Sequence, residues 1–488
     1  MSPVTEPRPL PELLDALPTC RVEGERAVAV SGIDYRSSEA ERGSVFFAVP
    51  GARADGHDFA AEAVRRGAGV VVVERSLPLP AEVTQVIVPS VREAMGPMAA
   101  VFYGRPAERL LMVGVTGTNG KTTTTYLLDG IFREAGLTPS VIGTTGVRID
   151  GRPMAIDRTT PEAPDLHRLL ARMVDEGVRA VAMEVSSHGL DQHRVGGARF
   201  DCAVFTNLSQ DHLDYHGDLQ AYFEAKARLF DPSLADRAAI NHDSPEGRRL
   251  VGRIPTLTYG LEPGAELRAE DVVVQSDGVR FRADGLSVRS HLRGGFSVHN
   301  CLAALAAGRQ VGIPDDAAVR GIAALRGVPG RMEPVDVGQE FQVLVDYAHT
   351  PDSVENVLRA ARPLTEGRVI VVLGCGGDRD RGKRPLMGEA ATRLAYLTVI
   401  TSDNPRSEDP LAIIGEIEPG ARRGGGEFVV ESDRRAAIRL ALERAAPGDV
   451  VVIAGKGHET GQEFADRTIP FDDRVVAREE LESLGVAR

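Results

Sequence analysis

Short apolar runs, each followed by polar or glycine-rich residues, recur along the whole chain of 488 residues. Near the N-terminus, the runs at 44–49 and 69–73 have this pattern, and an alanine-rich helical segment at 59–66 lies between them. A longer helical pattern follows at 91–103. Continuous apolar runs are typical of buried parallel strands, and their alternation with helices is typical of an open α/β sheet.

The middle of the chain repeats this pattern and then changes. Further strands are predicted at 111–115, 179–186, 201–207 and 238–241. Residues 255–295 contain Asp-Gly turns between short alternating stretches, as β-hairpins do, and an alanine-rich helix is predicted at 300–310.

The last third returns to alternating strands and helices. Its strands are predicted at 342–346, 369–373, 397–401 and 450–453. A chain of this length is too long for one core. The pattern therefore predicts an α/β protein of three domains at 1–106, 107–329 and 330–488, each built on a mainly parallel or mixed sheet with helices. The central domain is expected to be P-loop ATPase-like and the third Rossmann-like.

A phosphate-binding turn stands where the predicted strand at 111–115 ends. The segment Gly117–Thr123 reads GTNGKTT and opens a helical pattern. Backbone N–H groups of such a turn and the helix N-terminus bind phosphate oxygens, while Lys121 reaches the phosphates and Thr122 ligates Mg²⁺. The spacing is a variant, since Val115 occupies the usual first glycine position. An ordinary strand–turn–helix is the alternative, and the Gly-Lys-Thr-Thr run argues against it.

Composition narrows the class of protein. A net charge of −13 argues against sequence-independent nucleic-acid binding. Four scattered cysteines argue against a disulfide framework and fit a reducing compartment. The N-terminus lacks a signal-peptide pattern, and no apolar run has membrane-spanning length. We expect a cytoplasmic protein without membrane insertion.

Eight further motifs follow in a fixed order over nearly the whole chain. They are Thr159–Pro161, Glu184–His188, Thr206–Leu208, Asp211–Asp214, Glu224–Lys226, Gly330–Arg331, Asp346–His349 and Asp403–Arg406. With the variant P-loop, this set resembles the Mur ligase family of peptidoglycan biosynthesis. Asp403–Arg406 together with Gly455–Glu459 is similar to the motifs of its diaminopimelate-adding members.

The resemblance implies an ATP site and a metal site. The expected ATP-binding residues are Gly117, Thr118, Asn119, Gly120, Lys121, Thr122, Thr123, Asn300, Arg331 and Asp346. The expected Mg²⁺ ligands are Thr122, Glu184, His212 and a carbamylated Lys226, and Lys121, Lys226, His212 and Glu184 are expected to be catalytic. The alternatives are a helix N-cap for Asn300, a solvated linker charge for Arg331 and a structural loop histidine for His212.

Lys226 owes its assignment to the resemblance alone. The segment EAKARLF reads as an amphipathic helix, which by itself places Lys226 in solvent. Family members carry a carbamylated lysine at the matching position, and carbamylation requires an amine whose pKa is depressed.

The resemblance also implies two organic substrates. UDP-N-acetylmuramoyl-L-alanyl-D-glutamate is expected at Ser37, Ser38, His57, Thr159, Thr160, Ser187, Gln192 and Arg194. The family's Asp-Ser-Arg is Asp34–Arg36 here, with Tyr35 in place of serine, which leaves the uridine contacts open. Diaminopimelate is expected at Arg379, Asp403, Asn404, Arg406, Gly455 and Glu459. Surface ion pairs are the alternative for Arg379 and Arg406.

The implied activity is an ATP-dependent amide ligation through an acyl phosphate, by a monomer, with meso-diaminopimelate as the expected isomer. Another amide ligase of the superfamily, such as a folylpolyglutamate synthetase or a neighbouring Mur enzyme, is the nearest alternative. A nucleotide-gated binding protein without ligase activity is an alternative of another class. Amino-acid-dependent ADP release separates a ligase from a binder.

Overall fold

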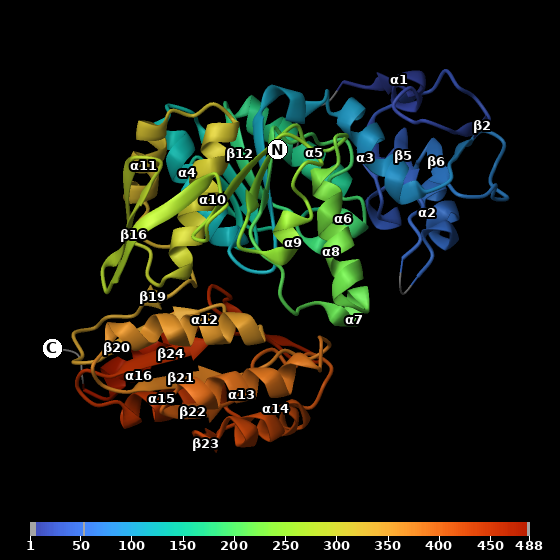
Figure 1. Cartoon of the computed structure of the whole chain (residues 1–488). Coiled ribbons are helices and arrows are strands. Elements are labelled where there is room, and N and C mark those ends of the chain that lie inside the picture. Colours follow the sequence, from blue (N-terminus) through green and yellow to red (C-terminus); the bar gives the residue numbers. More distant parts are fainter. Residues whose placement is uncertain (1–5, 52–53, 486–488) are drawn as a thin grey trace.

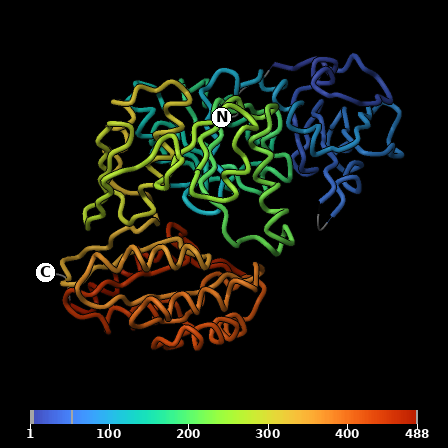
Figure 2. The backbone as a smooth tube through the Cα atoms, in the orientation of Figure 1, coloured from blue at the N-terminus to red at the C-terminus, as the bar shows by residue number. Residues whose placement is uncertain are grey.

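The computed structural model describes residues 6–51 and 54–485, so part of the polar loop at 51–57 lies outside the described residues. Three sheets of five, eleven and six strands organise this part of the chain. Figure 1 shows the N-terminal and central domains side by side and the C-terminal domain below them, with helix α12 (Pro351–Ala361) on the side of the central domain. The tube in Figure 2 passes through them in chain order. The predicted three-domain α/β architecture is confirmed.

The N-terminal sheet has the strand order β2-β7-β6-β5-β4, parallel except for β2. The strands are β2 (Arg21–Glu23), β4 (Gly32–Asp34), β5 (Ser44–Phe47), β6 (Val70–Val73) and β7 (Thr84–Ile87). Alternate side chains of β5 and β6 enter two separate clusters, one with α3 (Val91–Phe102) and one with α2 (Ala60–Arg66). Both faces are therefore covered, which explains the continuous apolar runs in the sequence.

The central sheet places β8 (Leu111–Thr116) between β12 (Ala180–Glu184) and β13 (Cys202–Phe205), all three parallel. One side continues through β9 (Pro139–Gly143), β10 (Gly146–Ile149) and β11 (Arg152–Met154). The other continues through β14 (Ala238–Asn241), β15 (Thr256–Gly260), β16 (Leu267–Gln275), β17 (Gly278–Ala283) and β18 (Leu286–Ser290). The carboxyl ends of three parallel strands thus meet at the middle of the sheet.

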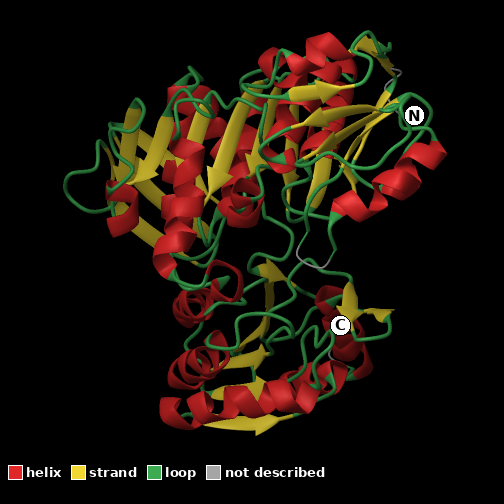
Figure 3. Ribbon diagram, turned by 90° about the vertical axis from the view of Figure 1, so that its right-hand side faces the viewer, coloured by secondary structure: helices red, strands yellow, loops and turns green. Residues whose placement is uncertain are grey.

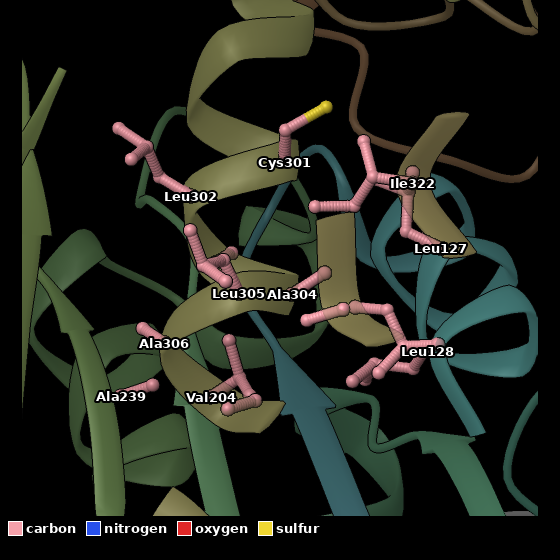
Figure 4. Packing of buried hydrophobic residues seen from close by; sticks show 14 of the residues in the cluster. Leu127, Leu128, Val204, Ala239, Cys301, Leu302, Ala304, Leu305, Ala306 and Ile322 are labelled. Carbon is pink, nitrogen blue, oxygen red and sulfur yellow. The ribbon is translucent and has the colours of Figure 1, made fainter. Parts of the chain in front are cut away.

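Helices on the two faces of this sheet hold those strand ends in place. Figure 4 shows Leu127 and Leu128 of α4 (Lys121–Glu134) near Leu305 of α10 (Phe296–Gln310), with Val204 of β13 beside them. Helix α11 (Asp315–Ala324) joins the same cluster, and α5 (Ala163–Asp175) and α8 (Leu219–Ala227) cover the other face. Helix α10 begins four residues before the predicted start. Asn300 therefore lies inside it, and the N-cap alternative for this residue is wrong.

The C-terminal sheet has the order β19-β20-β24-β21-β22-β23 and is parallel except for β19. Its strands are β19 (Glu333–Pro334), β20 (Gln342–Asp346), β21 (Val369–Leu373), β22 (Leu397–Ile400), β23 (Glu427–Val430) and β24 (Val450–Ala454). Its two faces are covered by α12, α13 (Lys383–Leu394) and α14 (Pro410–Gly424), and by α15 (Arg434–Arg444) and α16 (Asp473–Ser483). Figure 3 shows helices on both sides of this sheet. Among the described residues, no helix combines the length and apolar character needed to cross a membrane.

Candidate active site

The turn between β8 and α4 forms a phosphate cradle at the middle of the central sheet. Gly117 and Gly120 have φ angles of +146° and +87°, which side chains with a Cβ rarely adopt. A Cβ on Gly120 would also overlap Asn300 Oδ1, so the helix α10 residue expected at the nucleotide lies directly against the turn. Lys121 Nζ donates to the carbonyl oxygens of Gly117 and Thr118 at 2.9 and 2.8 Å.

A cavity of about 570 Å³ lies beside this cradle. Asn119, Gly120, Thr122, Thr123, Asn300, Arg331 and Asp346 of the expected ATP site all line it. Its other walls come from β16, the start of α10 and helix α12, which include Val272, Phe296 and Val357. A pocket with apolar walls on one side and an anion-binding helix N-terminus on the other suits a nucleotide base and its phosphates.

Arg331 connects the C-terminal domain to the cradle. Its guanidinium donates to Thr122 Oγ1 at 3.0 Å and lies 4.8 Å from the ring centre of Tyr347. Asp346 accepts a hydrogen bond from the Met332 backbone N–H at 2.8 Å, and burial raises the pKa of its carboxyl group. Arg331 is therefore held at the domain interface, and the solvated-linker alternative is wrong.

Glu184 is the last residue of β12, and His212 lies in the loop that follows β13, directly before helix α7 (Leu213–His216). The Glu184 carboxylate accepts hydrogen bonds from Thr144 N and Oγ1 at 2.9 and 3.0 Å. Burial lowers the pKa of His212 to about 2, so the imidazole is neutral and keeps a lone pair at pH 7. Both residues line a second cavity of about 310 Å³ together with Thr122 and Lys121.

Glu184, His212 and Thr122 suit a divalent cation only together with further oxygen ligands. Among the residues that the structure describes, no group of three His, Cys, Asp or Glu side chains is placed to hold a metal by itself. Glu184 and His212 supply one carboxylate and one imidazole, and the Thr122 hydroxyl lines the same cavity. Mg²⁺ prefers oxygen ligands and keeps several waters, which these groups and bound phosphates can provide.

Lys226 is buried, with 1% of its surface exposed. Its Nζ donates to the carbonyl oxygen of Gly117 at 2.9 Å and lies 4.3 Å from the ring centre of Tyr222, one turn earlier in α8. Burial lowers the pKa of Lys226 well below its usual range, and the charge of Lys121 lowers it further. The solvent-facing reading of EAKARLF is wrong, because α6 (Ser187–Asp191) and the P-loop cover this face of the helix.

The third-domain residues reach the same 310 Å³ cavity. All six expected at diaminopimelate line it: Arg379, Asp403, Asn404, Arg406, Gly455 and Glu459. Arg406 Nε pairs with Glu463 at 2.7 Å, and its Nη1 donates to Gly377 O at 2.9 Å. Arg406 therefore forms an ion pair with Glu463, as the surface-pair alternative expected, but it also lines the cavity.

Lys456, to which sequence reasoning assigned no role, supports two residues of this group. Its ammonium is fully buried and donates to Asn404 Oδ1 at 2.8 Å and to Glu459 Oε2 at 2.9 Å. Asn404 Nδ2 in turn donates to Glu459 Oε2 at 2.8 Å. The Gly-Lys-Gly-His-Glu motif contained the signal, since a lysine three residues before a glutamate can fold back on it.

The expected sugar-peptide residues of the central domain surround the end of β12. Thr160 is fully buried and donates to Glu184 O at 3.1 Å, and Ser187 Oγ lies 3.0 Å from His216 Nε2. Arg194 Nη2 donates to Gln192 Oε1 at 2.6 Å. Thr159 alone of this set lines the 310 Å³ cavity.

The expected N-terminal residues lie farther from this cavity. Ser37 Oγ donates to Glu62 at 2.9 Å, and Ser38 lies beside it in the same short 3₁₀ helix. His57 is buried; its Nδ1 lies 2.6 Å from Asp55 and its Nε2 accepts from the Glu74 N–H at 2.9 Å. Both ring nitrogens of His57 are therefore engaged within the fold, where they hold the loop in place.

Tyr35 joins the N-terminal and central domains. Its hydroxyl donates to Asp165 Oδ2 of α5 at 2.6 Å. Backbone atoms of Gly96 and Gly196 also come together there, where a Cβ on Gly96 would overlap Gly196. Tyr35 thus supplies a contact between the two domains that hold the expected sugar-peptide residues.

Asp211 is a second residue that the sequence assigned no role. Lys383 Nζ of the C-terminal domain donates to Asp211 Oδ1 at 3.2 Å, and both side chains are buried. Burial opposes the charge of Asp211, but the neighbouring His349 and Lys383 hold its pKa well below its usual range. Together with an Asn119–Asp352 hydrogen bond of 2.7 Å, this pair holds the C-terminal domain against the cradle.

The chain is similar to known proteins over nearly its whole length. Three family models match: the Mur ligase family catalytic domain at residues 29–103, the Mur ligase middle domain at 115–308 and the Mur ligase glutamate ligase domain at 330–457. A UDP-N-acetylmuramoyl-L-alanyl-D-glutamate--2,6-diaminopimelate ligase of Solibacter usitatus is 46% identical over 99% of this chain and 98% of its own length. The chain belongs to the Mur ligase family.

Solved Mur ligases have the same fold over nearly the whole chain. A diaminopimelate ligase of the same name is 35% identical, with a TM-score of 0.70 over 99% of this chain and all of its own. A MurF ligase from Thermotoga maritima, solved in complex with ADP, has a TM-score of 0.61 at 21% identity, over 93% of this chain and 96% of its own. The family resemblance seen in the motifs is confirmed.

Proposed function

We propose that this Mur ligase joins diaminopimelate to UDP-N-acetylmuramoyl-L-alanyl-D-glutamate, with conversion of ATP to ADP and phosphate, in peptidoglycan biosynthesis. One observation carries the proposal. The cavity of about 310 Å³ is lined at once by the cradle residue Lys121, by Glu184 and His212, and by the third-domain residues Arg379 and Glu459. Phosphate, metal and amino-acid groups therefore border a single space, as an acyl-phosphate ligation requires.

The chain's own residues would perform the reaction mainly by positioning. Lys121 and the P-loop amides hold the ATP phosphates in line with the D-glutamyl γ-carboxylate, which attacks the γ-phosphate. Thr122, Glu184 and His212 would hold Mg²⁺, which would supply positive charge against the phosphates. Closure of the C-terminal domain through Arg331 and Lys383 excludes water from the acyl phosphate.

The amine of diaminopimelate then attacks the acyl carbon and phosphate leaves. Glu459 would hold an ammonium group of the incoming amino acid; Lys456 donates to its Oε2 at 2.9 Å, and the residue lines the cavity. Arg379 and Arg406 are placed for carboxylates, which they can bind with two N–H groups each. An Arg pair at the far end of the amino acid favours a second carboxylate over the single ammonium of lysine.

Lys226 is proposed to carry a carbamate. Its amine lies beside another cation in a buried position, which favours the neutral form that reacts with CO₂. The product is an anion with two oxygens, and it would offset the charge of Lys121 and complete the oxygen ligands of the metal site.

The proposed sites divide over the proposed domains 1–106, 107–329 and 330–488. UDP-N-acetylmuramoyl-L-alanyl-D-glutamate would lie between the first two domains, near Ser37, Ser38, Thr159, Ser187 and Arg194, with His57 supporting the loop. ATP would lie between the last two. We place the enzyme in the cytoplasm as a monomer.

The test is ADP formation with UDP-N-acetylmuramoyl-L-alanyl-D-glutamate and, separately, meso-diaminopimelate, LL-diaminopimelate and L-lysine. We expect release with meso-diaminopimelate and little with L-lysine. The Lys121→Ala variant should release no ADP, and near-normal ligation by it would refute the site. A protein that binds ATP but releases no ADP with any amino acid would be a binding protein and not a ligase.

A further inference from the structure

Arg434 and Asp473 form an ion pair at the base of the third-domain loops. Arg434 begins α15 and Asp473 begins α16, and neither side chain has any exposed surface. Nε donates to Oδ1 at 2.8 Å and Nη2 donates to Oδ2 at 2.7 Å, so the pair is bidentate. Neither residue lines the active-site cavity, and the proposed reaction uses neither.

The remaining N–H groups of Arg434 reach two strand ends. Nη1 donates to the carbonyl oxygen of Ser402 at 3.2 Å, just after β22, and Nη2 donates to that of Ala454 at 3.0 Å, the last residue of β24. In the sheet, β21 separates these two strands, so no backbone ladder joins them. The guanidinium therefore bridges two strands that β21 separates, and it binds Ser402 at the start of one loop and Ala454 directly before the other.

These two loops carry most of the proposed diaminopimelate site. The loop after Ser402 contains Asn404 and Arg406, and the loop after Ala454 contains Glu459. They meet above Arg434, because a Cβ on Gly455 would overlap Asp403 Oδ2. The Asn404–Glu459 hydrogen bond of 2.8 Å then joins them at the cavity wall.

We propose that Arg434 is a positioning residue that sets the relative placement of the two diaminopimelate-binding loops. The inference rests on the proposed function, because it assigns the loops to that substrate. A planar guanidinium offers five N–H groups in a rigid fork, which lets one side chain hold a carboxylate and two carbonyl groups at once. Asp473 holds the fork in the orientation that reaches both loops.

A merely stabilising role for the pair makes a different prediction. Removal of one partner leaves a buried charge without its counter-ion, whereas replacement of both partners by apolar side chains is often neutral or stabilising. The double variant Arg434→Met with Asp473→Leu thus removes the charges but also the two loop anchors. Measuring both the stability of this variant and its affinity for diaminopimelate distinguishes a stabilising role of the pair from a role in positioning the loops.

The same sheet supplies a control ion pair at the opposite ends of its strands. Arg368 and Asp449 precede β21 and β24, with Nε and Nη2 of Arg368 donating to Asp449 Oδ2 at 3.0 and 2.6 Å. This pair lies at the amino ends of the strands and touches neither loop. The double variant Arg368→Met with Asp449→Leu removes an ion pair from the same sheet, although its Arg368 side chain is 36% exposed.

The experiment measures thermal unfolding and the KM for each of the three substrates in the full-length enzyme. For the Arg434→Met/Asp473→Leu variant we expect near-normal unfolding, a KM for diaminopimelate raised on the order of tenfold or more, and a KM for ATP within about twofold of the wild type. The control pair should leave all three KM values unchanged. A normal KM for diaminopimelate in a folded Arg434→Met/Asp473→Leu variant would overturn the proposal.

The Arg434→Lys variant covers the case in which the double variant fails to fold. Lysine keeps the charge opposite Asp473 but lacks the fork, so we expect a raised KM for diaminopimelate and faster amide exchange in loops 402–406 and 455–459. Full rescue by lysine would show that only the charge matters and would refute the proposal. Wild-type enzyme that turned over another amino acid in place of diaminopimelate would refute the proposed function. In that case, amide exchange in loops 402–406 and 455–459 would still test whether Arg434 positions them.

Discussion

Lys121 and Lys226 donate hydrogen bonds to the same acceptor, the carbonyl oxygen of Gly117, and each N–O distance is 2.9 Å. Lys121 belongs to the P-loop helix, and Lys226 lies 105 positions later in the chain. Two ammonium groups on one oxygen repel each other, and both are removed from water. This arrangement favours loss of one proton or conversion of one amine to an anion.

Replacement of Lys226 by methionine tests this relationship. The variant replaces a buried amine beside Lys121 with an apolar side chain, so for the protein without the carbamate we expect an unchanged or higher melting temperature. We expect a loss of ADP formation of at least about 100-fold, because no carbamate can form. The check is calorimetry on the ligand-free protein and a coupled ADP assay. The same assay on wild-type enzyme should show lower activity in CO₂-depleted buffer and recovery with bicarbonate; an active methionine variant would contradict the carbamate.

Gly120→Ala tests the phosphate cradle. Alanine at a φ of +87° costs about 1 kcal/mol or more, and its Cβ would overlap Asn300 Oδ1. We expect a KM for ATP raised on the order of tenfold, measured by ADP release, with little change for diaminopimelate. Gly136→Ala is the matched control, because that glycine also has positive φ but its Cβ would meet nothing within 4 Å. The cradle model predicts that this control loses stability without losing affinity for ATP.

Lys383→Met tests the contact that holds the C-terminal domain closed. The substitution leaves the Asp211 carboxylate buried without the ammonium group 3.2 Å away, which disfavours the closed arrangement. We expect a larger radius of gyration in solution scattering and a kcat/KM lowered on the order of tenfold. Addition of Asp211→Asn should restore compactness by removing the unpaired charge. No change in either scattering or activity in the single variant would contradict a role in closure.

The buried His167 predicts how stability depends on pH. Burial lowers its pKa to about 4 in the folded protein, below the usual value of 6.5, so the unfolded chain binds more protons between these values. Stability is therefore present above pH 6.5 and lost as the pH falls toward 4, by about 2 kcal/mol between pH 7 and pH 5. Urea unfolding of the wild type and of His167→Gln at both pH values measures this.

The comparison between the two proteins isolates His167 from other titrating groups. Glutamine does not titrate and can still donate to Gly196 O, which His167 Nε2 contacts at 2.9 Å. The difference in unfolding free energy between wild type and variant should change by about 2 kcal/mol between pH 7 and pH 5. Parallel losses of stability in the two proteins would contradict the assignment to His167.

Much of the fold was predictable because it depends on local pattern. The runs at 44–49, 111–115, 369–373 and 450–453 became parallel strands, since strands buried on both faces must be apolar throughout. Strands β9 to β11 were not predicted, because Pro139–Met154 mixes glycine, threonine and charged residues as an antiparallel edge does. The start of α10 was placed too late because Phe296–His299 lacks an alanine-rich pattern.

By itself, the sequence determined the strand–turn–helix of the cradle and the identity of its chemistry, because glycine torsions and a lysine–threonine pair act over a few consecutive residues. The tertiary structure alone decided which side chains meet. It buried Lys226 against Gly117, joined Lys456 to Glu459, and placed Arg434 beneath two loops that β21 separates. The burial and pairing of these side chains depend on residues distant in the chain, so they cannot be predicted from the periodicity of a single helix.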